Sequence, residues 1–293
     1  MLRTRRFLLV GHFCALLVLS IAAVRPSLAK VRINGSTTVN PVVVEAAQAL
    51  RAETDAEILI DTVGGSSGGL AALADGRAEV GMLSRPLTRE DRHRFPSVDF
   101  RAVQIGTDAV ALVVSRDVWD GGIRSLNRDQ VQALYEGRVR NWQDVGGPDR
   151  RVVFFNKEPG RGTWEVFARW LYGDPVAAPL VNLPEVGSNE EGRNKVASTP
   201  GSVTQLSAAW ADNHRVFALG LRDERGEAHL PTPENIARGT YPLARPLLLV
   251  TDGSPDSETR RILDFLTGSR GQSLVARHGY LSVLPPTLES QSP

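Results

Sequence analysis

Three consecutive hydroxyl residues, Ser36-Thr37-Thr38, follow a short apolar run that ends at Gly35. Just beyond them, Pro41 opens a segment whose apolar residues recur at helical spacing as far as Leu50. The N–H groups of a first helical turn have no partner within the helix, and the helix dipole favours negative charge there. A strand that ends at glycine and leads into a hydroxyl-rich helix start is therefore typical of an anion site, although an ordinary helix cap has the same composition.

Two more stretches in the first hundred residues repeat this construction. A β-like run from Ile58 ends in Gly64-Gly65-Ser66-Ser67-Gly68-Gly69, and a strand-like segment over 78–83 ends in Ser84-Arg85-Pro86. Helical spacing follows each of them, so we expect a parallel α/β sheet. Ligands of such sheets bind at the carboxyl ends of the strands. The side chains expected together at this edge are Ser36, Thr37, Thr38, Ser66 and Ser84.

The second half of the chain carries a related stretch after a strand predicted over 151–155. It reads Asn156-Lys157-Glu158-Pro159-Gly160-Arg161-Gly162-Thr163-Trp164, and its glycines permit close backbone approach where a helix begins. Arg161 can offer a planar fork of donors to a tetrahedral oxyanion, and Lys157 can add a point charge. In the helix that follows, Glu165 and Arg169 have the i,i+4 spacing of an exposed ion pair.

The stretch from Gly65 to Gly69 also fits the pattern G-x-S-x-G, the nucleophile elbow of serine hydrolases, with Ser67 as the nucleophile. That mechanism needs an acid and a histidine further along the chain. The histidines after Ser67 stand among charged or loop residues, and they are His93, His214, His229 and His278. A secreted serine hydrolase that uses Ser67 therefore stays open as an alternative function.

The two ends of the chain differ from the part between them. Residues 1–29 have arginines before an apolar run and end in Ser27-Leu28-Ala29, the pattern of a secretory signal peptide cut after Ala29, with a retained membrane anchor as the alternative. The only cysteine, Cys14, lies in this segment, so the mature protein would have no disulfide and no cysteine-ligated metal. The polar, proline-rich residues 285–293 are expected to form a disordered tail. The pattern predicts an exported protein.

Charge and length limit the classes of function. Removal of the signal peptide would take away four arginines and no acidic residue, so the formal net charge of +1 would become −3. Nothing in that balance indicates a nucleic-acid partner or a membrane surface. The remaining chain of about 264 residues is long for a single hydrophobic core and suits two lobes.

Beyond residue 100 the hydrophobic pattern predicts several further elements. We expect strands over 109–115, 216–221 and 247–250, and helices over 126–136, 163–171, 189–196, 233–238 and 257–267. The chain should cross into the second lobe near 115–121 and return with the strand at 247–250.

Five short motifs follow one another along the chain, and their order makes a resemblance specific. They are Gly35-Ser36-Thr37-Thr38, Gly65-Ser66-Ser67-Gly68-Gly69-Leu70, Met82-Leu83-Ser84-Arg85-Pro86-Leu87, Tyr135-Glu136-Gly137 with Asn141-Trp142, and Gly160-Arg161-Gly162-Thr163-Trp164. A looser match, Tyr241-Pro242-Leu243-Ala244-Arg245-Pro246, follows further along and has the character of a return strand. The series resembles the phosphate-binding proteins of phosphate ABC transporters, which belong to the periplasmic-binding-protein superfamily. The likeness covers most of residues 31–172 and is looser after Gly187.

The resemblance implies an α/β, two-lobe periplasmic-binding-protein-like fold of type II, with the ligand in the cleft between the lobes. It implies an exported, periplasmic, non-enzymatic protein that binds inorganic phosphate for ABC-type uptake or sensing and docks on a membrane permease. It implies no cofactor, metal or nucleic acid, and we expect a monomer. The residues implied to contact phosphate are Ser36, Thr37, Thr38, Ser66, Ser84, Arg85, Lys157, Arg161, Gly162 and Thr163. A binder of another tetrahedral oxyanion, such as sulfate, is an alternative.

The lobes are expected to divide the chain into three ranges. Residues 30–116 would form the first part of lobe 1, 117–240 would form lobe 2, and 241–284 would return to lobe 1. Two departures from the family pattern put ion selectivity in question. The family usually has arginine at the position of Lys157 and serine at the position of Arg161, and some relatives have aspartate at the position of Arg85. The segment 202–205 replaces the family's Ile-Gly-Tyr, for which the sequence offers no explanation.

Overall fold

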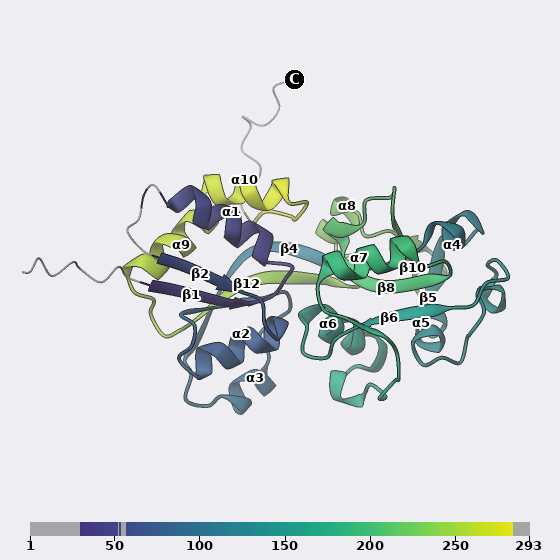
Figure 1. Cartoon of the computed structure of the whole chain (residues 1–293), viewed down its shortest axis with the longest axis horizontal. Coiled ribbons are helices and arrows are strands. Elements are labelled where there is room, and N and C mark those ends of the chain that lie inside the picture. Colours follow the sequence, from purple (N-terminus) through teal and green to yellow (C-terminus); the bar gives the residue numbers. More distant parts are fainter. Residues whose placement is uncertain (1–29, 52, 54–56, 284–293) are drawn as a thin grey trace, which may run out of the picture.

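The structure is a computed structural model that describes residues 30–51, 53 and 57–283 (Figure 1). The predicted signal peptide at 1–29 and the predicted tail at 285–293 lie outside these residues. Within the described part, no helix has both the length and the apolar character that a membrane crossing requires.

A twisted sheet of nine strands runs through the molecule. It consists of β1 (Lys30–Gly35), β2 (Glu57–Asp61), β3 (Val80–Leu83), β4 (Phe100–Val114), β6 (Val153–Lys157), β7 (Glu185–Val186), β8 (Ser202–Ser207), β9 (Phe217–Ala218) and β12 (Ala244–Asp252). The strand order is β2-β1-β3-β12-β4-β8-β6-β7, and β9 also pairs with β4. A smaller sheet consists of β11 (Ala228–His229), β10 (Gly220–Arg222) and β5 (Ser125–Asn127).

The helices fall into two groups on either side of the molecule's middle (Figure 1). One group contains α1 (Asn40–Leu50), α2 (Gly65–Ala74), α3 (Arg89–Arg94), α9 (Ser257–Thr267) and α10 (Ser269–Arg277). The other contains α4 (Arg116–Asp120), α5 (Arg128–Tyr135), α6 (Gly162–Tyr172), α7 (Asn189–Ser198) and α8 (Pro233–Ala237), together with 3₁₀ turns at Trp142–Val145, Pro175–Ala177 and Ala208–Trp210.

The long strand β4 belongs to both halves of the sheet. Its first part, Phe100 to Ala109, pairs antiparallel with β12, and its last part, Val110 to Val114, pairs antiparallel with β8. The sheet therefore passes from one half to the other within β4, and β12 returns beside it (Figure 1). The exact division of the chain between lobes stays our proposal.

Most of the predicted elements are present. The parallel pairing of β1 with β2 and with β3 confirms the three strand–loop–helix units at the start of the chain. The single strand predicted over 216–221 is wrong, because β9 and β10 lie there in different sheets with Leu219 between them. The pattern did not predict α10, although Leu274 and Val275 bury an apolar face of it.

Each half has its own hydrophobic core. The core around β1, α1, α9 and α10 is aliphatic and includes Val31, Ile33, Val43 and Leu249. The core of the other half is rich in aromatic rings, which are those of Tyr135, Trp142, Phe154 and Phe167 among others. The two halves thus pack around separate cores, which is typical of two lobes.

The unexplained segment 202–205 is part of the buried strand β8, between β4 and β6. Its polar side chains are satisfied inside the sheet: the Thr204 hydroxyl donates to the Phe155 carbonyl oxygen at 2.7 Å, and the Gln205 amide donates to Asn156 Oδ1 at 2.9 Å. Burial of a polar group costs little free energy when the group keeps its hydrogen bonds. This buried strand therefore tolerates polar residues that are more typical of a protein surface.

Candidate functional site

A small cavity of about 10 Å³ lies where loops of the two halves meet. It is lined by Ser36, Thr37, Thr38, Gly65, Ser66, Ser84, Lys157, Arg161, Gly162, Thr163 and Gly187. Nine of the ten predicted site residues therefore lie together, and only Arg85 does not. That these residues contact an anion stays a prediction.

Three helices begin at this cavity. Thr38 lies in the turn before α1, Ser66 in the first turn of α2, and Thr163 in the first turn of α6. A Cβ on Gly162 would lie 2.5 Å from Ser66 Oγ, so only glycine lets α6 approach this closely. The N–H groups of three helix starts thus supply donors and positive partial charge around one small space.

Hydrogen bonds tie the three loops of the first half to one another. The Ser36 hydroxyl donates to Ser84 Oγ at 2.9 Å, and the Ser84 N–H donates to Ser66 Oγ at 3.1 Å. The Thr38 N–H donates to Ser36 Oγ at 3.1 Å. Because Ser66 Oγ is an acceptor here, its hydroxyl proton is left for a further acceptor in the cavity.

Arg245, which the sequence pattern did not single out, lies directly behind the cavity. Its side chain is 0 % exposed, and its guanidinium donates to Thr163 Oγ1 at 2.9 Å and to Thr38 Oγ1 and Ser84 Oγ at 3.3 Å each. Since each of these oxygens accepts from Arg245, each hydroxyl proton can point at an anion. The motif 241–246 contains this arginine, but its apolar neighbours indicated only a return strand.

Asp108 balances the buried charge of Arg245. The two residues face each other in the β4–β12 register, and Asp108 Oδ2 accepts from Arg245 Nε at 3.0 Å and from the terminal nitrogen at 2.8 Å. The Ser207 hydroxyl donates to the other carboxylate oxygen at 3.0 Å. Burial raises the pKa of the Asp108 carboxyl, and the guanidinium of Arg245 opposes that rise.

Lys157 brings an amine to the cavity from the end of β6. The residue is 1 % exposed, and its Nζ donates to the Gly187 carbonyl oxygen at 3.2 Å and to that of Ser188. Burial, reinforced by the charges of Arg161 and Arg245, lowers the pKa of Lys157 to about 7. This amine can therefore gain or lose its proton near neutral pH.

Arg161 reaches the cavity from the turn before α6. Its guanidinium donates to Glu158 Oε2 at 2.7 Å and to the Thr62 carbonyl oxygen, in the other half, at 3.4 Å. None of the described residues that line the cavity is acidic, so donors and cations dominate it.

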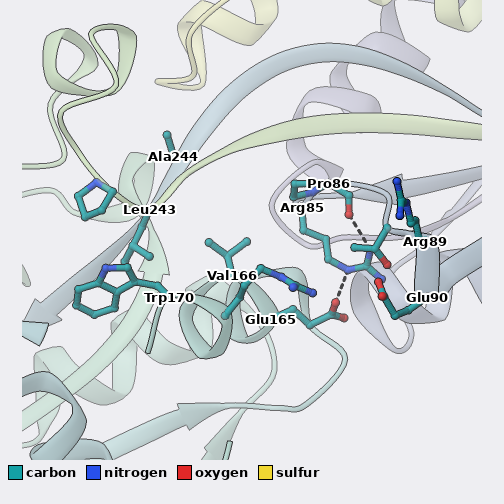
Figure 2. Close-up of a pocket in the computed structure, with 12 residues that line it drawn as sticks. Arg85, Pro86, Arg89, Glu90, Glu165, Val166, Trp170, Leu243 and Ala244 are labelled. Atoms are coloured by element: carbon teal, nitrogen blue, oxygen red, sulfur yellow. Dashed lines mark hydrogen bonds and ion pairs between the residues drawn. The ribbon is translucent and has the colours of Figure 1, made fainter. Parts of the chain in front are cut away.

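Arg85 lies outside the cavity, contrary to what the resemblance implied. Its guanidinium forms ion pairs with Asp91 at 2.6 Å and with Glu165 at 2.5 Å, and these two carboxylates draw it away from the cavity. Figure 2 shows the pair with Glu165. Glu165 is correspondingly not the exposed partner of Arg169 that their i,i+4 spacing predicted. It pairs instead with a residue of the other half.

A family model described as "PBP superfamily domain" matches residues 20–270. The chain belongs to the PBP superfamily. Among curated relatives, the phosphate-binding protein PstS of Bacillus subtilis is 27% identical over 256 residues, which are 86% of this chain and 80% of that protein. PstS of Borreliella burgdorferi is 26% identical over 260 residues, which are 86% of this chain and 90% of that protein.

Solved structures of this superfamily resemble the chain over most of its length. One is the structure of a protein from Clostridium perfringens that is assigned as a phosphate ABC transporter substrate-binding protein and contains bound phosphate. The comparison with it gives a TM-score of 0.76 and 27% identity, and covers 87% of this chain and 100% of that chain. An ABC-type phosphate transport receptor from Vibrio cholerae has a TM-score of 0.68 and 26% identity, with the same coverage. The predicted two-lobe α/β fold is confirmed.

Ser67 of this PBP-superfamily chain has charged partners rather than an imidazole. Its hydroxyl donates to Glu165 Oε1 at 2.8 Å and accepts from Arg85 at 3.4 Å. No histidine in the described part of the chain is hydrogen-bonded to Ser67; His229 and His278 pair with carboxylates elsewhere. The hydrolase alternative is not favoured.

Proposed function

We propose that this chain binds inorganic phosphate as the substrate-binding subunit of a phosphate ABC transporter. The observation that carries the proposal is the cavity itself, in which three helix N-termini and two cationic side chains converge, with no acidic side chain among the described lining residues. The names of the relatives and the phosphate bound in the Clostridium perfringens protein support the same ligand.

A phosphate ion would find donors on all sides. The hydroxyls of Thr38, Ser84 and Thr163 accept from Arg245 and so can donate to phosphate oxygens. The N–H groups of the helix starts add further donors, and protonated Lys157 adds charge. In an enclosed space these interactions are stronger than in water, because the local dielectric constant is low.

Binding requires movement, because the cavity is lined from both halves and most of its lining residues are buried. We propose that the lobes separate to admit phosphate and close over it, with β4 and β12 as the connection about which they move. The lobe ranges 30–116, 117–240 and 241–284 belong to this proposal.

Export, partner and assembly are proposed with the function. We propose that residues 1–29 direct the chain to the periplasm, where a monomer delivers phosphate to a membrane permease for uptake or sensing. The phosphate-transport names of its relatives support a binding protein rather than an enzyme.

Isothermal titration of refolded, phosphate-free protein with phosphate tests the proposal. We expect one saturable site per chain, and absence of heat with phosphate at millimolar concentration would overturn it. A fluorophosphonate probe, which labels serine nucleophiles, tests the hydrolase alternative in the same sample. Labelling that Ser67→Ala abolishes would favour the hydrolase, and no labelling is expected.

A further inference from the structure

We propose that Arg85, Asp91, Ser67 and Glu165 form a latch that holds the two halves together over the anion without touching it. The proposal rests on the proposed phosphate binding. In it, Glu165 and Arg85 are positioning residues that set phosphate affinity through closure.

Arg85 is prepared for this role by its own half of the molecule. Its two terminal nitrogens donate to both Asp91 oxygens at 2.6 and 2.9 Å. One of them also donates to the Pro86 carbonyl oxygen at 2.9 Å, as Figure 2 shows. Asp91 is fixed in turn by a capping box with Thr88 at the start of α3. The fork of Arg85 is thus occupied, and its Nε is left for the other half.

Glu165 completes the latch from the second half. One carboxylate oxygen lies 2.5 Å from Arg85 Nε, and the other accepts from the Ser67 hydroxyl at 2.8 Å. The side chains of Arg85 and Glu165 are 4 % and 17 % exposed, so this ion pair is largely shielded from water. A shielded pair is attracted more strongly than a surface pair, and loss of one partner is correspondingly costly.

Latch and cavity residues alternate along the same segments. Ser66 lines the cavity and Ser67 belongs to the latch; Ser84 lines the cavity and Arg85 belongs to the latch. On α6, Thr163 lines the cavity and Glu165 follows within the same first turn. Since a helical turn moves as a unit, one displacement of α6 closes the cavity and forms the latch together.

On one side of the latch the side chains of the two halves leave a groove between them. A groove of about 490 Å³ lies beside the latch, with Arg89 and Glu90 on the first half and Val166, Trp170 and Leu243 across from them (Figure 2). The groove separates these side chains, and beside it the contacts of Glu165 with Arg85 and with Ser67 join α6 to the first half. When the halves separate, Arg85 keeps Asp91, while Glu165 loses both of its partners to water.

The test is Glu165→Gln, which keeps the shape of the side chain and removes its charge. Glu90→Gln is the matched control, because Glu90 is an exposed carboxylate on the same groove. We expect Glu165→Gln to weaken phosphate binding at least tenfold, through a faster dissociation rate, with the association rate changed less than threefold. Ser67→Ala should weaken it several-fold, and Glu90→Gln less than twofold.

A second readout separates the latch from a defect in folding or in phosphate contact. Because the mature chain would have no cysteine, spin labels at His93→Cys and Asp129→Cys can report the closed fraction by the distance between the halves. Glu165→Gln should lower that fraction at equal phosphate, with an unchanged melting temperature without phosphate. Phosphate binding by Glu165→Gln within twofold of the wild type would overturn the latch.

Failure of the proposed function would look different. If the wild type binds no phosphate, that function is overturned, and the latch is then judged from the closed fraction without ligand. Equal closed fractions in the wild type and Glu165→Gln would overturn the latch as well, and a lower fraction in the variant would support it.

Discussion

The side-chain amide of Asn189 donates a hydrogen bond to the Thr38 hydroxyl at 3.0 Å, although 151 residues separate them along the chain. Asn189 is the first residue of α7 in the second half, and its side-chain oxygen Oδ1 accepts from the Ser207 N–H at 3.2 Å. The same Thr38 oxygen also accepts from Arg245. The Thr38 oxygen therefore accepts from Arg245 and from Asn189 of the second half, and these two donors set the direction of its proton.

Phosphate should make the protein more compact. The cavity takes its lining from both halves, so only the closed arrangement offers every donor at once. Small-angle scattering should show a smaller radius of gyration with phosphate than without it. An unchanged scattering profile at saturation would argue against a site between lobes.

Thr38→Ala and Arg161→Ala should each weaken phosphate binding by about ten- to a hundredfold. Each removes one hydrogen bond to a charged ligand, which is worth roughly 1.5–3 kcal/mol. Titration calorimetry measures the loss, and Arg140→Ala, at an exposed arginine of the second half, is the control. If Arg161→Ala binds like the wild type, then its turn contributes no charge to the site.

Arg245→Lys should reduce phosphate affinity more than tenfold while the protein still folds. Lysine keeps a charge beside Asp108, but it cannot reach the three hydroxyls that the guanidinium joins. Arg245→Met should also lower the melting temperature, because Asp108 would be left buried without its cation. Equal phosphate affinity in Arg245→Lys and the wild type would show that those hydroxyls need no fixed orientation.

Phosphate binding at pH 8 should take up protons through Lys157. Its pKa of about 7 leaves much of the amine neutral at that pH, and a bound anion raises the pKa, so binding gains a proton. The contribution of Lys157 to affinity is therefore full below pH 7 and declines as pH rises above it. Calorimetry in two buffers of different ionisation enthalpy measures the uptake, and Lys157→Met should remove it. Identical heats in both buffers would contradict the assignment.

Sulfate should compete with phosphate more strongly here than in relatives that place a carboxylate in the site. Only phosphate keeps a proton to donate, and a buried carboxylate would accept that proton while repelling sulfate. Among the described residues that line the cavity none is acidic, and Asp108 lies behind Arg245. Phosphate titrations in the presence of sulfate decide this. Sulfate without effect even at a ten-thousandfold excess would mean that another acceptor reaches the ion.

The sequence predicted the part of the site that local chemistry determines. Ser36, Ser66 and Ser84 each follow a strand of one parallel sheet, so their meeting at one edge follows from topology. Arg245 could not be found this way, because its place depends on β12 returning between β3 and β4. The position of Arg85 had a local signal, since Thr88 and Asp91 have capping-box spacing and bring a carboxylate beside it.

Arg245 pairs with Asp108 across β12 and β4, the two strands about which we propose that the lobes move. Residues at a hinge move least when lobes open and close. The Arg245 guanidinium should therefore keep its position in both the open and the closed arrangement. An incoming ion would first be attracted by this stationary positive charge behind the cavity and would afterwards be contacted by the mobile loops. Capture of the ion would then depend on the residues at the hinge, and its retention would depend on the loops that close over it.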